Sequence, residues 1–326
     1  MAEAYRFCLR ATGGTEVLEA EPMDVPPPGD GEVLVRHEAI GLNFIDTYHR
    51  SGLYPVPLPS GLGVEAAGLV EGLGAGVTGF LEGNRVGYFS GPLGAYATHR
   101  TIQASRLVKL PDSVKGEEAA AIMLKGCTAE MLIERCAKVQ DGDTVLVHAA
   151  AGGVGSILVP WLKALGAVVI AHAGSAEKAT KATALGADQA LSCAMEELAG
   201  EVRRLTGGRG VQVVLDGVGA ASWAASLGSV AKRGMIVSYG NASGPVPPFS
   251  PLELGRAGSV FLTRPSLFDY VADRKELEHS AARLFEMVAG GVVKPQIGAR
   301  YPLLEAAAAH SALEGRRTAG STILLP

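Results

Sequence analysis

Residues 144–239 alternate between short apolar runs and segments of helical spacing, and this alternation restricts the chain to few folds. The apolar runs predict strands over 144–148, 167–171, 188–191, 211–216 and 234–239. The segments between them predict helices over 154–165, 176–185, 195–206 and 220–231. Strands that alternate with helices form a parallel sheet covered on both faces. The expected fold class is therefore α/β, with a doubly wound parallel sheet.

A glycine-rich turn, HAAAGGVG at 148–155, joins the first of these strands to its helix. Against the dinucleotide-binding pattern G-x-G-x-x-G the turn reads A-A-G-G-V-G, with Ala150 in the first glycine position. Gly152 and Gly153 let the backbone approach a pyrophosphate, and the helix N-terminus adds N–H groups that favour negative charge. The turn therefore predicts a dinucleotide site, with a tight structural turn as the alternative.

The end of the second strand distinguishes the two nicotinamide cofactors. NAD sites carry an acidic residue there, about 20 positions beyond the glycines, for the ribose 2′-hydroxyl. This chain reads AHAGSAEK at 171–178, with no carboxylate at the strand end. Gly174 leaves room, Ser175 offers a donor, and Lys178 can meet a 2′-phosphate. The sequence thus favours NADPH, with an ordinary surface lysine as the alternative for Lys178.

The rest of the chain has a different pattern of apolar runs and turn residues. Its first third contains short strand-like runs separated by turns rich in proline and glycine, which predicts a mainly β module. Helices are expected over 117–136, with an interruption at Gly126, and over about 273–290. The tail TILLP reads as a last strand that rejoins the first module, and Pro160 is expected to bend the helix that contains it.

Composition excludes several classes of function. The 326 residues carry a formal net charge of −4, and no basic stripe marks a nucleic-acid surface. No apolar run is long enough to span a bilayer and no secretory leader is recognised, so we expect a cytoplasmic protein without membrane insertion. The four cysteines and seven histidines are scattered without metal-ligand spacing, and no metal site is expected.

Seven stretches together resemble one known family, the zinc-free quinone oxidoreductase (zeta-crystallin-like) branch of the medium-chain dehydrogenases/reductases. They are NFIDTYHRSGLYP (43–55), GVEAAG (63–68), LGAYA (93–97), LKGCTA (124–129), HAAAGGVG (148–155), SYGNASG (238–244) and TRPSL (263–267). Zinc-dependent relatives carry cysteine where Asn43 stands and histidine where Val64 stands, and neither residue here is a zinc ligand. The resemblance implies a discontinuous GroES-like substrate domain (1–124 and 266–326) and a Rossmann NADP-binding domain (125–265).

The resemblance also implies roles for individual residues. Asn43 and Tyr48 would be catalytic, and Tyr54 and Thr128 would border the substrate cleft. The residues implied to contact the cofactor are Asn43, Tyr54, Thr128, Gly152, Gly153, Val154, Gly174, Ser175, Lys178, Cys193, Gly240, Asn241, Thr263, Arg264 and Arg316. Each has a structural alternative: Asn43 as a turn residue, the tyrosines as core aromatics, and Arg316 as a solvated charge.

The expected activity is zinc-independent hydride transfer from NADPH to a quinone. A quinone accepts hydride with little acid catalysis, so positioning and hydrogen bonding suffice. One alternative is an enone, alkenal or enoyl-thioester reductase, in which a proton donor such as Tyr48 is more necessary. Another is a non-catalytic protein that senses NADPH or binds RNA. The apolar run at 256–264 is expected to be an edge strand of the nucleotide sheet, and an exposed apolar edge favours pairing. The resemblance implies a homodimer in which these edges pair, with a monomer whose edge is covered as the alternative.

Overall fold

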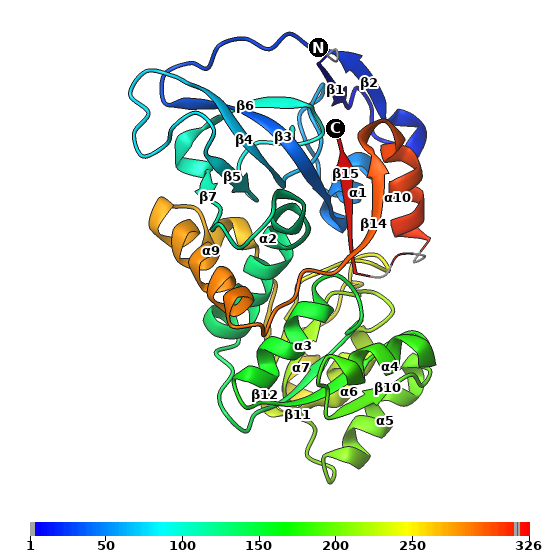
Figure 1. The fold of residues 1–326 in the computed structure, drawn as a ribbon. Coiled ribbons are helices and arrows are strands. Elements are labelled where there is room, and N and C mark those ends of the chain that lie inside the picture. The colour runs from blue at the N-terminus through cyan, green and yellow to red at the C-terminus, as the bar shows by residue number, and fades with distance from the viewer. Residues whose placement is uncertain (1–3, 316–317, 319) are drawn as a thin grey trace. The chain divides into compact units, whose positions relative to one another are not determined.

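The computed structural model describes residues 4–315, 318 and 320–326 (Figure 1). The chain divides into two compact units. The first unit comprises Met1–Lys125, Val271–Phe285 and Pro295–Pro326, and the second comprises Gly126–Tyr270 and Glu286–Lys294. Each unit has a sheet of its own and is described separately.

The second unit contains a six-stranded sheet in which every neighbouring pair is parallel. Its strands are β8 (Thr144–Val147), β9 (Val168–His172), β10 (Gln189–Leu191), β11 (Val211–Asp216), β12 (Val230–Ser238) and β13 (Phe261–Thr263). Its helices include α3 (Gly155–Ala164), α4 (Ala176–Ala184), α5 (Met195–Leu205), α6 (Trp223–Ser229), α7 (Leu252–Arg256) and α8 (Leu267–Tyr270). The spatial order is β10-β9-β8-β11-β12-β13. The expected doubly wound parallel sheet is confirmed, and its strand order reverses between β8 and β11, where such sheets bind ligands.

Apolar strands and amphipathic helices explain this arrangement. The central strand β8 buries Val145, Leu146 and Val147 completely, as a strand covered on both faces must. Helix α5 buries Leu198 and Val202, four residues apart on one face. Its acidic residues lie in the first turn and its arginines in the last, which complements the helix dipole.

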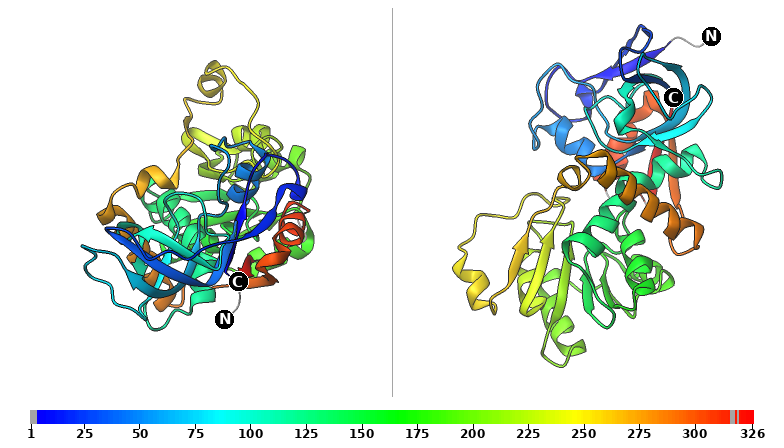
Figure 2. Two further views of the ribbon diagram at one scale, coloured as in Figure 1. Left: turned by 90° about the horizontal axis from the view of Figure 1, so that it is seen from above. Right: turned by 90° about the vertical axis from the view of Figure 1, so that its left-hand side faces the viewer.

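The first unit contains a seven-stranded, mostly antiparallel sheet and a separate two-stranded sheet. The large sheet comprises β3 (Glu32–Leu42), β4 (Ala66–Leu73), β5 (Arg85–Tyr88), β6 (His99–Gln103), β7 (Val108–Lys109), β14 (Ile297–Pro302) and β15 (Ser321–Leu325). The small one comprises β1 (Tyr5–Cys8) and β2 (Glu19–Pro22). The tail strand β15 pairs with β3 in antiparallel register, so the expectation that the tail rejoins the first module is confirmed. Figures 1 and 2 both show this red strand beside the blue ones.

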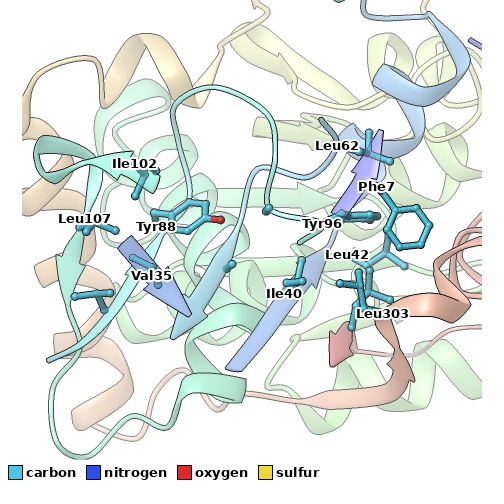
Figure 3. Packing of buried hydrophobic residues seen from close by; sticks show 14 of the residues in the cluster. Phe7, Val35, Ile40, Leu42, Leu62, Tyr88, Tyr96, Ile102, Leu107 and Leu303 are labelled. Carbon is cyan, nitrogen blue, oxygen red and sulfur yellow. The ribbon is translucent and has the colours of Figure 1, made fainter. Parts of the chain in front are cut away.

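The core of the first unit lies along this sheet (Figure 3). The ring of Phe7 meets the ring of Tyr96 edge to face, with 6.2 Å between centroids. Tyr88 belongs to the same buried cluster, and its hydroxyl lies 2.9 Å from Nε2 of His37. Helices α1 (Phe44–Ser51) and α10 (Ala306–Glu314) belong to the first unit. Helices α2 (Gly116–Glu130) and α9 (Arg274–Ala289) each begin in the first unit and end in the second.

Two local expectations are wrong. Gly126 does not interrupt its helix: α2 runs through it to Glu130 and continues as a π-helical segment, η3 (Met131–Cys136). Buried apolar neighbours on both sides of Gly126 hold the helix together against the low helix propensity of glycine. The edge strand begins at Phe261 rather than at 256, because α7 extends to Arg256 and the chain then turns through Ser259, where φ is 58°.

No helix within residues 4–315 and 320–326 has the length and apolar character that a membrane crossing requires.

Candidate functional site

The glycine turn of the second unit lies where β8 ends and α3 begins. Ala149 adopts φ 49°, and the N–H of Gly152 donates to its carbonyl oxygen at 2.8 Å. The hydroxyl of Ser156 donates to the carbonyl of Gly153 at 3.0 Å. A Cβ atom on Gly155 would collide with the backbone of Ala149 and Ala150. The last glycine of the pattern is therefore required for close packing of α3 on β8.

The strands on both sides of the reversal are joined by buried polar groups. Asp216 ends β11, and its Oδ1 accepts hydrogen bonds from the N–H of Val218 at 2.8 Å and of Gly219 at 3.3 Å. The hydroxyl of Ser226 lies 2.6 Å from Oδ2 of Asp216 and 2.9 Å from Nε2 of His148. Burial lowers the pKa of His148 to about 4. A neutral His148, the first residue of the glycine turn, is thus tied to the end of β11.

The end of β9 carries the residues expected to select the cofactor. Ser175 is the N-cap of α4, and its Oγ accepts from the N–H of Lys178 at 3.2 Å. The site of a Cβ on Gly174 has nothing within 4 Å, so this position is open. Glu177 is paired with Lys181 at 2.7 Å, and that hydrogen bond lowers the pKa of Glu177. A carboxylate near Lys178 is therefore already engaged by another lysine.

The other expected cofactor residues of this unit lie at several strand ends. Arg264 follows β13 and donates to the carbonyl of Ser238 at 2.7 Å, which joins the ends of β13 and β12. Gly240 packs against the backbone of Gly217 so closely that a Cβ could not be accommodated. Cys193 offers its carbonyl oxygen to Nε2 of His172 at 3.1 Å. Of the remaining expected residues, Asn241 follows β12, Thr263 lies on β13 and Thr128 on α2, while Arg316 lies outside the described residues.

The first unit carries the expected catalytic residues on and around α1. Asn43 is the N-cap of this helix and forms a capping box with Asp46. Tyr48 lies on the helix and Tyr54 just beyond it, with ring centroids 5.2 Å apart and planes at 65°. The N–H of Tyr54 donates to the carbonyl of Tyr48 at 3.1 Å, which holds the two together. Both rings are partly exposed.

Three buried charged residues surround Asn43, and sequence reasoning did not single them out. Glu65 is fully buried, and its Oε2 accepts from Nδ2 of Asn43 at 2.8 Å. The Nζ of Lys125 lies 3.9 Å from the same oxygen. Asp46 is also fully buried, and its Oδ2 accepts from the N–H of Asn43 at 2.8 Å. Glu65 and Lys125 could have been identified from the sequence, because each is the one charged residue in an otherwise uncharged, mostly apolar stretch, GVEAAG and IMLKGC respectively.

Burial dominates the pKa values in this cluster. It raises the pKa of Asp46 to about 7, with a further increase from the charge of Glu65. Burial also raises the pKa of Glu65, while Lys125 and the N–H of Leu124 lower it. The pKa of Lys125 is lowered by burial and raised by the two carboxylates. The cluster can therefore change its protonation near neutral pH.

A chain of hydrogen bonds leads from Asp46 to the surface helix α10. The hydroxyl of Tyr96 lies 3.3 Å from Oδ2 of Asp46 and 2.9 Å from Nε2 of His310. Arg50 reaches Nδ1 of His310 at 3.2 Å and pairs with both carboxylate oxygens of Glu314. The capping carboxylate of α1 is thus linked to a buried arginine.

The residues fit a phosphorylated dinucleotide. The turn at 149–154 lies at the strand-order reversal, Gly174 is open, and Ser175 and Lys178 lie beyond β9 with Glu177 engaged elsewhere. Within residues 4–315, 318 and 320–326, no three side chains of His, Cys, Asp or Glu gather as metal ligands would.

The order of the parallel sheet and its glycine turn, together with the separate β-rich unit, define a medium-chain dehydrogenase/reductase. Two protein-family models match: "Zinc-binding dehydrogenase" over residues 153–284 and "Alcohol dehydrogenase GroES-like domain" over residues 29–112. A "Quinone oxidoreductase" of Pseudomonas aeruginosa is 48% identical, covering 99% of this chain and 100% of that protein. The chain belongs to the quinone oxidoreductase family of these enzymes.

Two further relatives bear on the activity. The crystal structure of Escherichia coli quinone oxidoreductase complexed with NADPH matches with a TM-score of 0.96 and 44% identity, over 99% of this chain and 100% of that one. A "2-haloacrylate reductase" of Burkholderia sp is 44% identical, with 98% of each chain covered.

Proposed function

We propose that this protein is an NADPH-dependent quinone reductase. The observation that carries the proposal is the end of β9, where Ser175 and Lys178 take the place of the acidic residue that an NAD site needs. Full-length similarity to quinone oxidoreductases, one of them in complex with NADPH, supports it.

The residues of the second unit would bind and orient the cofactor. The glycine turn would hold the pyrophosphate with Gly152, Gly153 and Val154, and the strand ends would hold the two halves of the dinucleotide. When bound, NADPH supplies a hydride, which with one proton converts a quinone to its hydroquinone. The remaining cofactor contacts expected from the sequence, Arg316 included, are part of the proposal.

The first unit would supply the residues that act on the substrate. Asn43 and Tyr48 are proposed as catalytic residues, and Tyr54 as a residue that borders the substrate. Thr128, from the second unit, is proposed to border the substrate as well. We keep the domain limits inferred from the sequence, 1–124 with 266–326 and 125–265. The reaction needs no metal in this proposal, because a quinone is a ready hydride acceptor that needs positioning rather than Lewis-acid help.

A second candidate activity is reduction of an activated carbon–carbon double bond. Its support is the 44% identity to a 2-haloacrylate reductase. Here hydride adds to the β-carbon and a proton must reach the α-carbon, so a general acid is more necessary. Tyr48→Phe would then abolish turnover of enones and haloacrylates and lower quinone turnover far less, because a quinone depends less on a general acid.

The proposal includes a homodimer that forms through β13. This strand is the last in its sheet, and the side chain of Phe261 is 59% exposed. An apolar sheet edge of this kind pairs readily with a second copy.

The deciding experiment is anaerobic oxidation of NADPH and of NADH with a panel of quinones and a panel of enones and haloacrylates. Quinone turnover with NADPH that persists in chelator is the expected result. Turnover of the double-bond panel alone would favour the second candidate. Tight NADPH binding without turnover of either panel would contradict both and favour the NADPH-sensing alternative.

A further inference from the structure

The side-chain amide of Asn43 is committed to acceptors within the first unit. One Nδ2 hydrogen points to Oε2 of Glu65 at 2.8 Å, and the carbonyl of Gly41 lies 3.4 Å from the same nitrogen. An asparagine NH₂ group has two hydrogens, so both are used. Because Asn43 is only 6% exposed, replacing these bonds by others would first require breaking a buried one.

Glu65 cannot turn away from Asn43. Its other oxygen, Oε1, accepts from the N–H of Leu124 at 2.6 Å, and Lys125 lies on the Oε2 side. The Cα of Gly41 packs against the same carboxylate, so closely that a Cβ atom there would collide with it. The carboxylate is therefore held at both oxygens and along one side.

With both NH₂ hydrogens used, the amide oxygen is the atom of the Asn43 side chain that is available to a ligand. It carries two lone pairs, one of which faces the N–H of Asp46 in the capping box, although that N–H donates to the main-chain carbonyl of Asn43 at 3.0 Å. The second lone pair can accept a hydrogen bond from a bound molecule or a water.

We infer that Glu65, backed by Lys125, is a positioning residue that fixes Asn43 as a hydrogen-bond acceptor in the proposed reduction. Asn43 then does not donate to the substrate oxygen; it orients a donor, such as a hydroxyl or a water. This inference rests on the proposed function, because Asn43 matters to turnover only if the chain is a reductase.

The test exchanges the two functional groups. In Asn43→Asp alone, two buried carboxylates face each other. In Glu65→Gln alone, the Gln oxygen must serve the N–H of Leu124, so its NH₂ group faces the NH₂ group of Asn43. The double variant Asn43→Asp/Glu65→Gln restores one hydrogen bond in the reverse direction. It keeps the total charge, an acceptor at position 43 and a good N-cap residue.

We expect each single variant to lower kcat at least tenfold and the double variant to return to within about threefold of the wild type. The thermal unfolding midpoint is measured on the same samples. A double variant that recovers its midpoint and not its kcat would overturn the inference, because Asn43 would then be needed as a donor.

A second measurement separates positioning from folding. If Glu65 acts through Asn43, Glu65→Gln changes kcat less than twofold in an Asn43→Ala background. If Glu65→Gln lowers kcat by the same factor with and without Asn43→Ala, the inference is contradicted. This result does not depend on whether the exchange variant Asn43→Asp/Glu65→Gln folds. A wild type without turnover would overturn the proposed function and this inference with it, whereas an active wild type with multiplying effects would overturn the inference alone.

Discussion

The hydroxyl of Ser226 lies 2.9 Å from Nε2 of His148, and the direction of this hydrogen bond is fixed. Ser226 has one hydrogen, which it gives to the carboxylate of Asp216 at 2.6 Å. His148 must therefore donate through Nε2–H, and its Nδ1 is a bare acceptor. Among the described residues this Nδ1 has no hydrogen-bond partner. The hydroxyl of Ser226, on helix α6, thus connects His148, which follows β8, to Asp216, which ends β11.

Ser226→Ala is expected to destabilise the protein by about 1–3 kcal/mol, because it leaves the buried Nε2–H of His148 without an acceptor. Asp216 loses one hydrogen bond but keeps the one that Ser222 donates to its Oδ2 at 2.7 Å. The matched control is Ser229→Ala on the same helix. Ser229 is equally buried, and its Oγ lacks a hydrogen-bond partner within the described part of the chain. Urea unfolding of both variants measures the difference, and equal losses would refute a special role for Ser226.

Lys178→Ala is expected to raise KM for NADPH about tenfold, the cost of one charge-assisted contact to the 2′-phosphate, and to leave KM for NADH unchanged. Lys181→Ala is the control, because the Lys181 ammonium pairs with Glu177 at 2.7 Å. That exposed pair contributes little, and a change below about threefold is expected. Equal changes for both cofactors in Lys178→Ala would show that this lysine does not read the phosphate.

Three buried histidines make stability depend on acidity. Burial lowers the pKa of His37 and of His310 to about 3 and that of His148 to about 4. Between these values and about 6.5 the unfolded chain binds more protons than the folded one, so stability rises with pH in this window and is lost as pH falls.

In the wild type, His310 binds a proton when the chain unfolds in this pH window. His310→Asn removes that proton uptake, so the free energy of unfolding should rise less steeply with pH in the variant. The slope is measured by urea unfolding between pH 4 and 6.5. His279→Asn is the control, because the side chain of His279 is exposed and its replacement should leave the slope as it is. Equal slopes in all three proteins would mean that His310 is charged in the folded state.

The titration of Asp46 changes the stability with pH in the opposite direction. Its folded pKa of about 7 exceeds the unfolded value, so its contribution to stability is full below about pH 4 and is lost as pH rises to 7. Asp46→Asn mimics the protonated carboxyl and keeps an acceptor for Tyr96. The stability of the wild type minus that of the variant should therefore fall between pH 4 and 7. A difference that is constant over this range would contradict the raised pKa.

Phe261→Asp is expected to convert a dimer to a monomer, because it places a charge on the proposed pairing edge of β13. Leu304→Asp is the control: its side chain is 62% exposed in the other unit, away from this strand in sequence and sheet. Sedimentation or light scattering gives the mass. A wild-type monomer, or a dimer that survives Phe261→Asp, would exclude this interface.

The sequence predicted the nucleotide-binding sheet well, because each strand there is an apolar run between helices of clear period. The start of β13 was misplaced because the run at 256–264 was interpreted as one strand, whereas Arg256 is the last residue of the short helix α7 and the strand begins at Phe261. The sequence did not predict the cluster of charged residues around Asn43, for a different reason. Glu65, Lys125 and Asp46 come together through β4, α2 and α1, and only tertiary pairing makes their charges neighbours.

Ser175 fills two roles that usually fall to different residues, since it caps α4 and lies where the cofactor's ribose is expected. Aspartate is as good a helix cap as serine. It is also the residue that favours an unphosphorylated ribose at this place. A change of coenzyme preference could therefore arise here by a single substitution that leaves the helix intact, and natural selection would meet no barrier of stability between the two forms.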